Sequence, residues 1–298
     1  MEKTKITFLG TSDSIPTKKR NHSAILLSYK NENILIDCGE GTQRQFKIAN
    51  ISPTKITRIL ITHKHGDHTF GLPGLFQTLA MLNYSKTVQL YGPRGIKHYI
   101  SFLKEITNIP ISLAIHEIEN KIIINESDFY VETKSMDHTS PSNAYSFIIK
   151  DKRRLDRNKL KKFKLPNSSI LKNLQQGEDI TYNNKQIKAA QVSYTEKGRK
   201  ITFILDTKFN QNAINLSKDA DLLIIESAFS IKDKDQAEKF KHLTATDAAI
   251  IAKKAKVKRL ILTHISQRYE HNLSIIEKEA KKIFKNVSIA KDFDSLIL

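Results

Sequence analysis

The chain has 298 residues, 39% of them hydrophobic, so it can form one large domain or two small ones around a sizeable core. No apolar run approaches the ~18 residues that a membrane helix needs, no leader segment is evident, and the single cysteine, Cys38, excludes an intrachain disulfide. We therefore expect a cytoplasmic protein without membrane association, whose net charge of +18 reflects either a lysine-rich proteome or a polyanionic partner such as RNA or DNA.

The first part of the chain alternates short apolar runs with turns that contain glycine or asparagine, which is typical of strands. From residue 59 onward the pattern changes to a strand followed by a helix. We expect strands at 6–9, 23–27, 34–36, 59–61 and 88–91, and helices at 71–82 and 95–106.

Further strands are expected between residues 112 and 149, and the composition then changes. Residues 151–186 are crowded with lysine and arginine, and proline and glycine interrupt them. This segment predicts an inserted basic arm that is partly helical and lies outside the main core, although a solvated surface helix would carry the same charge.

The apolar pattern resumes after the arm, with strands expected at 201–205, 222–225 and 260–262 and a helix at 244–255. A last helix and strand should close the chain. Two halves that each contain strands followed by helices predict an α/β (α+β) fold, in which two sheets pack face to face between helices.

The strongest chemical signal is His63-Lys64-His65-Gly66-Asp67-His68, which follows the apolar run at 59–61 directly. Strand ends are where such a fold opens a crevice, and imidazole nitrogen with carboxylate oxygen suits zinc and similar divalent ions. One tetrahedral site rarely needs four ligands so crowded, because neighbouring side chains point in different directions. We therefore expect two adjacent metal ions.

Three further candidate ligands stand at the ends of other predicted strands. His138 follows the strand at 129–131, Asp206 ends the strand at 201–205, and His264 repeats the apolar-run-Thr-His arrangement of His63. A single residue of this kind is more often a cap or a hydrogen-bonding group. Together with the first cluster they make seven ligands, enough for two metals that share one carboxylate.

The order of these motifs resembles the metallo-β-lactamase superfamily and, within it, the RNase Z family, endonucleases that trim the 3′ ends of precursor tRNAs. The histidine motif continues into Gly71-Leu72-Pro73-Gly74-Leu75 as in that family, and the similarity runs from about residue 4 to 270. The resemblance implies a metallo-β-lactamase αββα sandwich with the inserted arm at about 151–186.

The resemblance also implies two Zn²⁺ ions per subunit, with Mn²⁺ or another divalent ion as the alternative. One ion would take His63, His65 and His138. The other would take Asp67, His68 and His264, and Asp206 would bridge the two.

Three features point to RNA as the substrate. The loop at 16–21 matches the family's P-x-K-x-R-N loop, the segment 263–269 resembles its T-H-x-S-x-R-Y motif, and the basic arm lies between the His138 and Asp206 motifs, where family members carry an arm that clamps tRNA. The residues that we expect to bind substrate are Lys18, Arg20, Asn21, Arg268, Lys159, Lys161, Lys162 and Lys164.

The resemblance implies hydrolysis by a water that the two metals activate, leaving a 3′-hydroxyl on the tRNA and a 5′-phosphate on the trailer. Asp67 is assigned as a ligand and as the base that orients this water, with a ligand-only role as the alternative. His242, in a stretch that resembles the family's H-S-T motif, is the candidate proton donor to the leaving 3′-oxygen, or else only a neighbour of a helix N-cap. Glu226, the glutamate kept from the family's H-E-A-T stretch, would orient His242.

Other functions compete with precursor tRNA cleavage. A general metal-dependent phosphodiesterase or exonuclease would use the same chemistry on other RNA ends or small diesters. An RNA-binding subunit with a vestigial site would not need all seven ligands, and a lactamase or thioesterase has no evident use for the positive charge. The resemblance further implies a homodimer in which the arm of one subunit serves the site of the other.

Overall fold

The computed structural model describes residues 2–108 and 110–298. These residues divide into two compact units. The larger one, here called the sandwich unit, consists of Glu2–Ile124, Val131–Phe147 and Lys200–Leu298. The smaller one, the insert unit, consists of Asn125–Tyr130 and Ile148–Arg199.

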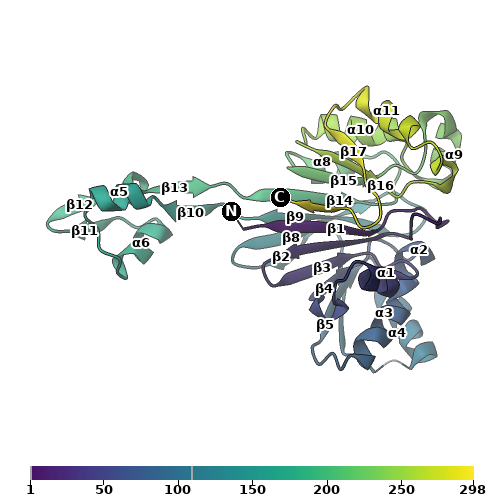
Figure 1. Cartoon of the computed structure of the whole chain (residues 1–298), viewed down its shortest axis with the longest axis horizontal. Coiled ribbons are helices and arrows are strands. Elements are labelled where there is room, and N and C mark those ends of the chain that lie inside the picture. Colours follow the sequence, from purple (N-terminus) through teal and green to yellow (C-terminus); the bar gives the residue numbers. More distant parts are fainter. Residues whose placement is uncertain (1, 109) are drawn as a thin grey trace. The chain divides into compact units, whose positions relative to one another are not determined.

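Two large sheets form the centre of the sandwich unit (Figure 1). The first has the strand order β18-β1-β2-β3-β4-β5-β6, and its neighbours pair antiparallel from β18 to β3 and parallel from β3 to β6. Its strands are β1 (Thr4–Gly10), β2 (Ala24–Tyr29), β3 (Glu32–Ile36), β4 (Arg58–Leu60), β5 (Val88–Gly92), β6 (Leu113–Glu117) and β18 (Ser295–Ile297).

The second sheet has the order β17-β16-β15-β14-β9-β8-β7, and its strands from β14 to β17 run parallel. Parallel pairing brings the carboxyl ends of these strands to one edge, where a site can form. The strands are β7 (Ile122–Asn125), β8 (Phe129–Met136), β9 (Ser142–Ile149), β14 (Arg199–Ile204), β15 (Leu222–Glu226), β16 (Leu260–Thr263) and β17 (Val287–Ile289).

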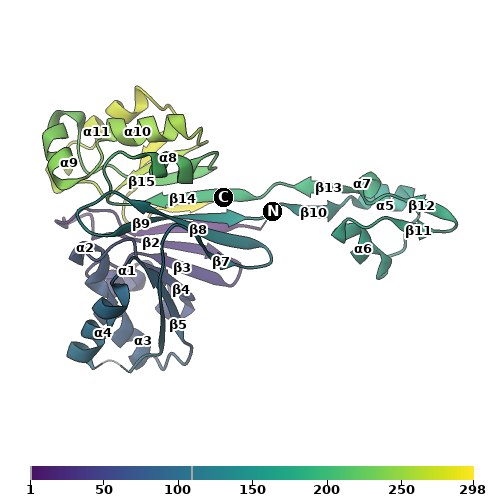
Figure 2. The same ribbon diagram turned by 180° about the vertical axis from the view of Figure 1, so that it is seen from behind.

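Helices cover the outer face of each sheet, which gives the four layers of an αββα sandwich (Figure 2). Beside the first sheet lie α1 (Thr42–Ile48), α3 (Gly71–Met81) and α4 (Ile96–Thr107), with the one-turn helix α2 (Gly66–Thr69) in the histidine motif. Beside the second lie α8 (Gln211–Ser217), α9 (Lys234–Phe240), α10 (Ala245–Lys254) and α11 (Ser274–Lys281).

Helix α3 packs on the first sheet through an apolar stripe of helical period. In α3 the buried residues Leu72, Leu75, Phe76 and Leu79 recur every three or four positions and pack into the core of the first sheet. The two sheets contact each other directly, because the rings of Tyr29 on β2 and Phe147 on β9 lie 5.6 Å apart edge to face.

The insert unit has a small core of its own. β10 (Lys152–Leu155) pairs with β13 (Ser193–Glu196), and β11 (Ile180–Tyr182) pairs with β12 (Lys185–Ile187). The helices α5 (Arg157–Lys162), α6 (Ile170–Gln176) and α7 (Ala189–Val192) complete it. The unit extends beyond the expected bounds of 151–186 because β10 needs β13 as its partner strand.

The predicted helices at 71–82, 95–106 and 244–255 correspond to α3, α4 and α10, and the predicted αββα sandwich is confirmed. The prediction of a single closing strand is wrong, because the chain forms both β17 and β18 after α11. β18 has only three residues, and it is a strand because it pairs with β1 at the other end of the sequence. Among the described helices, none has the length and apolar character needed to cross a membrane.

Candidate active site

The structure brings the seven predicted ligands together at the ends of four strands. Four of them occupy the turn after β4 and the start of α2, and the others follow β8, β14 and β16. Their ligand atoms form two groups, in each of which the atoms lie within 4.8 Å of one another. One group is His63, His65, His138 and Asp206; the other is Asp67, His68, Asp206 and His264.

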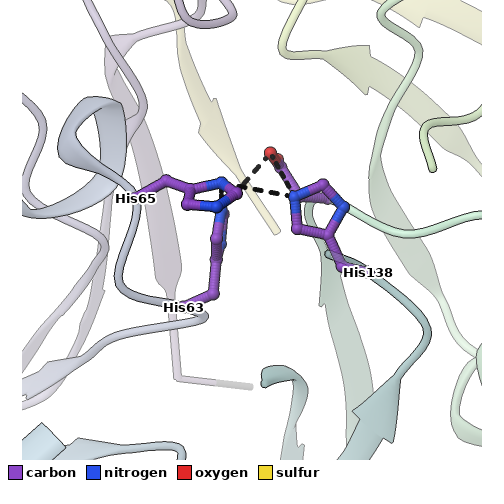
Figure 3. A group of neighbouring side chains, drawn as sticks. His63, His65 and His138 are labelled. Carbon is purple, nitrogen blue, oxygen red and sulfur yellow. Dashed lines mark hydrogen bonds and ion pairs between the residues drawn. The ribbon is translucent and has the colours of Figure 1, made fainter. Parts of the chain in front are cut away.

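The first group consists of three imidazole rings around one carboxylate. His63 and His65 approach from one side and His138 from the other (Figure 3). His65 Nδ1 lies 3.0 Å from His63 Nε2 and 3.3 Å from His138 Nε2, and His63 Nε2 lies 3.4 Å from Asp206 Oδ2.

The second group has two imidazoles and two carboxylates. His68 Nε2 lies 3.1 Å from Asp67 Oδ2, 3.3 Å from Asp206 Oδ1 and 3.2 Å from His264 Nε2. Asp206 therefore faces both groups, one carboxylate oxygen toward each.

Asp37, at the end of β3, orients the rings from outside the cluster. Its Oδ2 lies 2.7 Å from His68 Nδ1, and it accepts hydrogen bonds of 2.7 Å from both the backbone N–H and the hydroxyl of Thr62. Because this hydroxyl gives its proton to Asp37, it accepts the 3.1 Å contact from His63 Nδ1. His138 Nδ1 likewise donates to the Lys241 carbonyl at 3.0 Å. Each of these rings is thus held with Nε2 facing the cluster.

The donor set fits divalent cations. Burial lowers the pKa values of His63, His65 and His138, so these rings are neutral near pH 7. A proton on His65 Nδ1 can be donated to only one of the two nitrogens that face it, His63 Nε2 or His138 Nε2. One cation, in contrast, can accept the lone pairs of all three nitrogens. Asp206 Oδ1 is also buried without a hydrogen-bond partner among the described residues, as expected of a metal ligand.

Negative charge dominates the second group. Burial alone would lower the pKa of His68, but Asp206, Asp67 and Asp37 outweigh it and hold that pKa well above its usual value. Burial would conversely raise the pKa of Asp206, and the surrounding histidines hold it well below its usual range. Such a group attracts positive charge, which protons or metal ions can supply.

His242 and Glu226 form a pair beside the cluster. His242 Nδ1 lies 3.0 Å from Glu226 Oε1, and His242 Nε2 lies 3.9 Å from Asp206 Oδ2. Burial disfavours the charged ring, yet the two carboxylates raise the pKa of His242 to about 9. The N-cap of α10 is Thr244, two residues after His242.

A cavity of about 770 Å³ opens above the cluster. Its lining includes five of the predicted ligands and His242, and also residues that the sequence did not single out, among them Asp13, Ile15, Phe229, Phe240 and His271. Arg268 lines the cavity as well, with its guanidinium over the Phe229 ring at 5.2 Å and 3.4 Å from Asp233.

The loop at 16–21 carries one exposed and one buried basic side chain that were expected to bind substrate. Lys18 is exposed, but Arg20 is only 4% exposed, and its Nη1 donates to Thr11 Oγ1 at 2.7 Å and to the Ala290 carbonyl at 2.8 Å. Asn21 donates from its side chain to the Glu40 carbonyl at 2.7 Å. The charged group of Arg20 is therefore largely enclosed within the sandwich unit, and its contact with a phosphate stays a prediction.

The lysines expected to bind substrate in the arm lie on α5 and just after it. This helix begins at Asp156, whose carboxylate caps the N–H groups of Asn158 and Lys159. All four of these lysines are exposed and belong to the insert unit, namely Lys159, Lys161, Lys162 and Lys164.

Sequence reasoning missed Asp37 and the two phenylalanines that form an aromatic wall of the cavity, Phe229 and Phe240. For Asp37 a signal existed, because it follows a buried strand directly, as the ligands do. For Phe229 and Phe240 the sequence offered none, since neither stands in a motif that carries chemistry.

Comparison with known proteins places the chain among nucleases. It is 38% identical to a ribonuclease Z from Prochlorococcus marinus (strain MIT 9312) and 39% identical to one from Bacillus cereus, with 97% of each chain covered in both cases. It is 34% identical to a ribonuclease Z from Methanosarcina acetivorans, over 98% of this chain and 97% of that one.

Solved structures agree with these relatives. The short form of human tRNase Z superposes with a TM-score of 0.70 at 27% identity, covering 98% of both chains. The metallo-β-lactamase fold protein YhfI from Bacillus subtilis superposes with a TM-score of 0.72 at 19% identity, which shows the shared fold alone. Residues 4–159 also match the family model described as anti-Pycsar protein Apyc1. The chain therefore belongs to the ribonuclease Z family and, through residues 4–159, to that Apyc1 family.

Proposed function

We propose that this protein is an endoribonuclease that removes the 3′ trailer from precursor tRNA, leaving a 3′-hydroxyl on the tRNA and a 5′-phosphate on the trailer. The observation that carries the proposal is the pair of ligand groups that share Asp206, in a chain similar to ribonuclease Z proteins over nearly its whole length.

We assign one Zn²⁺ to His63, His65 and His138 and another to Asp67, His68 and His264, with Asp206 contacting both. Two divalent cations in such a site supply a water of lowered pKa and positive charge beside the phosphate oxygens. Mn²⁺ is the alternative ion. The separation of the seven ligands into two groups, each with nitrogen and oxygen donors, supports this assignment.

His242 is assigned as the general acid. With Nδ1 held by Glu226, its Nε2 is the nitrogen left to meet substrate, and a raised pKa keeps a proton there near neutral pH. It would give this proton to the 3′-oxygen that leaves the phosphorus. Glu226 is fixed in turn, because its Oε1 also accepts a 2.8 Å hydrogen bond from the backbone N–H of Thr207.

Asp67 is assigned as a ligand that also orients the attacking water. Its Oδ2 lies near His68 and His264, and its side chain borders the cavity that substrate would enter. A carboxylate that both borders the cavity and faces the ligand group can accept a hydrogen bond from a water positioned there.

Basic residues are assigned to the RNA backbone. Arg268 borders the cavity, where its guanidinium also lies 3.4 Å from Asp233, and Lys18 is exposed on its loop. Both would meet phosphates of the RNA. The lysines of α5 would bind the tRNA body. We further propose a homodimer in which the arm of one subunit serves the site of the other, which molar mass in solution would test.

The proposed function is tested with a 5′-labelled precursor tRNA that carries a 3′ trailer, incubated with zinc or manganese and, separately, with chelator. We expect a single metal-dependent cut near the discriminator nucleotide and a 3′-hydroxyl end. A 2′,3′-cyclic phosphate end would contradict the mechanism. Hydrolysis of a small phosphodiester without a cut in the tRNA would instead identify a general phosphodiesterase.

A further inference from the structure

One wall of the catalytic cavity is aromatic and has no part in the mechanism derived above. Phe240 is the last residue of α9, its side chain is 46% exposed, and it lines the same cavity as His65, Asp67 and His242. A single exposed phenyl ring is ordinary on a protein surface. One that borders a cavity containing the candidate metal ligands can meet substrate.

The backbone that carries Phe240 is tied to the site by its neighbours. Lys241 adopts a left-handed conformation with φ 55° and ends the helix. Its carbonyl accepts the 3.0 Å hydrogen bond from His138 Nδ1, and its ammonium lies 3.0 Å from Asp137 Oδ1. The next residue, His242, is bonded to Glu226. Phe240 is thus attached to a segment with fixed contacts to His138, Asp137 and Glu226.

The charges around this wall suit a polyanion that carries bases. Lys239 Nζ lies 5.4 Å from the centroid of the Phe240 ring, and the Arg268 guanidinium lies 5.2 Å from that of Phe229. The Phe229 ring in turn lies 6.0 Å from the ring of His242. Aromatic faces interleaved with cations are the means by which proteins bind single-stranded nucleic acid, because bases stack on the rings while cations meet the phosphates.

We propose that Phe240 is a nucleobase-stacking residue, whose ring takes the face of the base on the 5′ side of the cut. The side follows from the chemistry: His242 would protonate the 3′-oxygen that leaves, and that oxygen belongs to the last nucleotide of the mature tRNA. Lys239 meets a phosphate of the same strand. The inference rests on the proposed function and adds to it the contact that places the 3′ end of the tRNA beside the general acid.

The test compares precursor tRNAs that contain an intact or an abasic nucleotide at the position 5′ of the cut. With the intact base, Phe240→Ala should lower kcat/KM about 5- to 150-fold, the range that corresponds to about 1–3 kcal/mol for a stacked base. With the abasic substrate the wild-type protein should lose the same factor and Phe240→Ala should lose little more. Phe240→Tyr and Phe240→Trp should keep the activity of the wild type.

Phe209 provides a matched control. Its ring is 38% exposed and also lies 5.4 Å from a lysine ammonium, that of Lys254, but it is absent from the lining of the catalytic cavity among the described residues. Phe209→Ala should therefore leave cleavage and its dependence on the base unchanged. Metal content and melting temperature, measured for every variant, separate a loss of contact from a loss of folding.

A second readout does not require cleavage. A precursor tRNA with 2-aminopurine at the same position is bound in the presence of chelator, and its fluorescence should change on binding to the wild type and much less on binding to Phe240→Ala. Loss of activity in Phe240→Ala that is equal for intact and abasic substrates would overturn the inference, as would base dependence confined to the first trailer nucleotide. A wild type that shows the fluorescence change but never cuts the tRNA would instead refute the proposed function and leave the stacking contact standing.

Discussion

Glu226 Oε1 and His242 Nδ1 lie 3.0 Å apart, although one residue ends a central strand of the second sheet and the other follows α9 on the surface of the sandwich. Glu226 is fully buried, and His242 borders the cavity. A buried carboxylate that holds one imidazole nitrogen leaves the opposite nitrogen aimed at substrate, which is the geometry that general acid–base catalysis requires.

Replacement of His242 by Gln should lower single-turnover cleavage by about 10²–10⁴-fold, the usual contribution of a general acid. Glu226→Gln should lower the cleavage rate less, because it weakens the orientation of the His242 ring but leaves the ring in place. Metal content should stay at the wild-type level in both, measured by elemental analysis. A variant of His242 with a full cleavage rate would contradict the assignment.

Asp206→Ala removes the carboxylate that faces both ligand groups. We expect it to lose bound metal and nearly all cleavage, at least about 10³-fold, because the catalytic power assigned to the site depends on both ions. Asp235→Asn, on the exposed side of α9, is the matched control and should keep both. Full metal content together with a full rate in Asp206→Ala would show that the bridging assignment is wrong.

Asp37→Asn tests orientation of the ligands from outside the cluster. Asp37 contacts His68 directly and His63 through Thr62, so the variant should bind metal about 10- to 100-fold more weakly, as found for such outer partners of ligating histidines. Competition with a chromogenic chelator measures this affinity. Unaltered affinity would mean that the rings keep their orientation without Asp37.

The role of the arm in binding tRNA is tested by a variant in which four lysines are replaced by Gln, namely Lys159, Lys161, Lys162 and Lys164. Binding of precursor tRNA should weaken, and the slope of log K against log salt should become shallower by about 0.7–0.9 for each phosphate contact that is lost. A matched control exchanges Lys278, Lys281, Lys282 and Lys285 in and after α11, which removes the same charge elsewhere. An equal loss of affinity for precursor tRNA in both variants would mean that the RNA is bound through the net charge of the protein and not through the arm.

Asp292 should make the folded state more stable in mild acid than at neutral pH. Burial raises its pKa to about 6 despite the hydrogen bonds from Thr11 and Asn21. In the unfolded state the pKa of Asp292 is about 4. Between this pH and the pKa of the folded state, the folded protein holds a proton that the unfolded protein has lost. The free energy of unfolding therefore falls as the pH rises through this window.

The measurement is the free energy of unfolding of the wild type minus that of Asp292→Asn, taken from pH 4 to pH 7. This difference should decrease by about 1–3 kcal/mol, from about 1.4 kcal/mol for each unit of pKa shift. Asp294→Asn, at an exposed carboxylate two residues away, controls for removal of a charge. A difference that is flat or rises with pH would contradict the raised pKa.

The sequence by itself determined the elements that have a local pattern and the types of the ligands. Ile96, Tyr99, Ile100 and Leu103 recur with the helical period, and that local pattern was sufficient to predict α4. His63 and His264 each follow an apolar run and a threonine, and a ligand at the end of a buried strand needs no knowledge of the rest of the fold to be suspected. These features are local, so a window of about ten residues contains them.

The tertiary structure decided the contacts between distant segments. It buried Arg20 against Ala290, 270 residues away, paired β18 with β1, and brought Phe240 to the wall of the cavity. None of these has a local signature, because the partner of a guanidinium, an edge strand or an exposed ring is set by which segments the packed sheets bring together. The ligand types could thus be read from the chain, whereas the partners that hold and surround them depended on long-range packing.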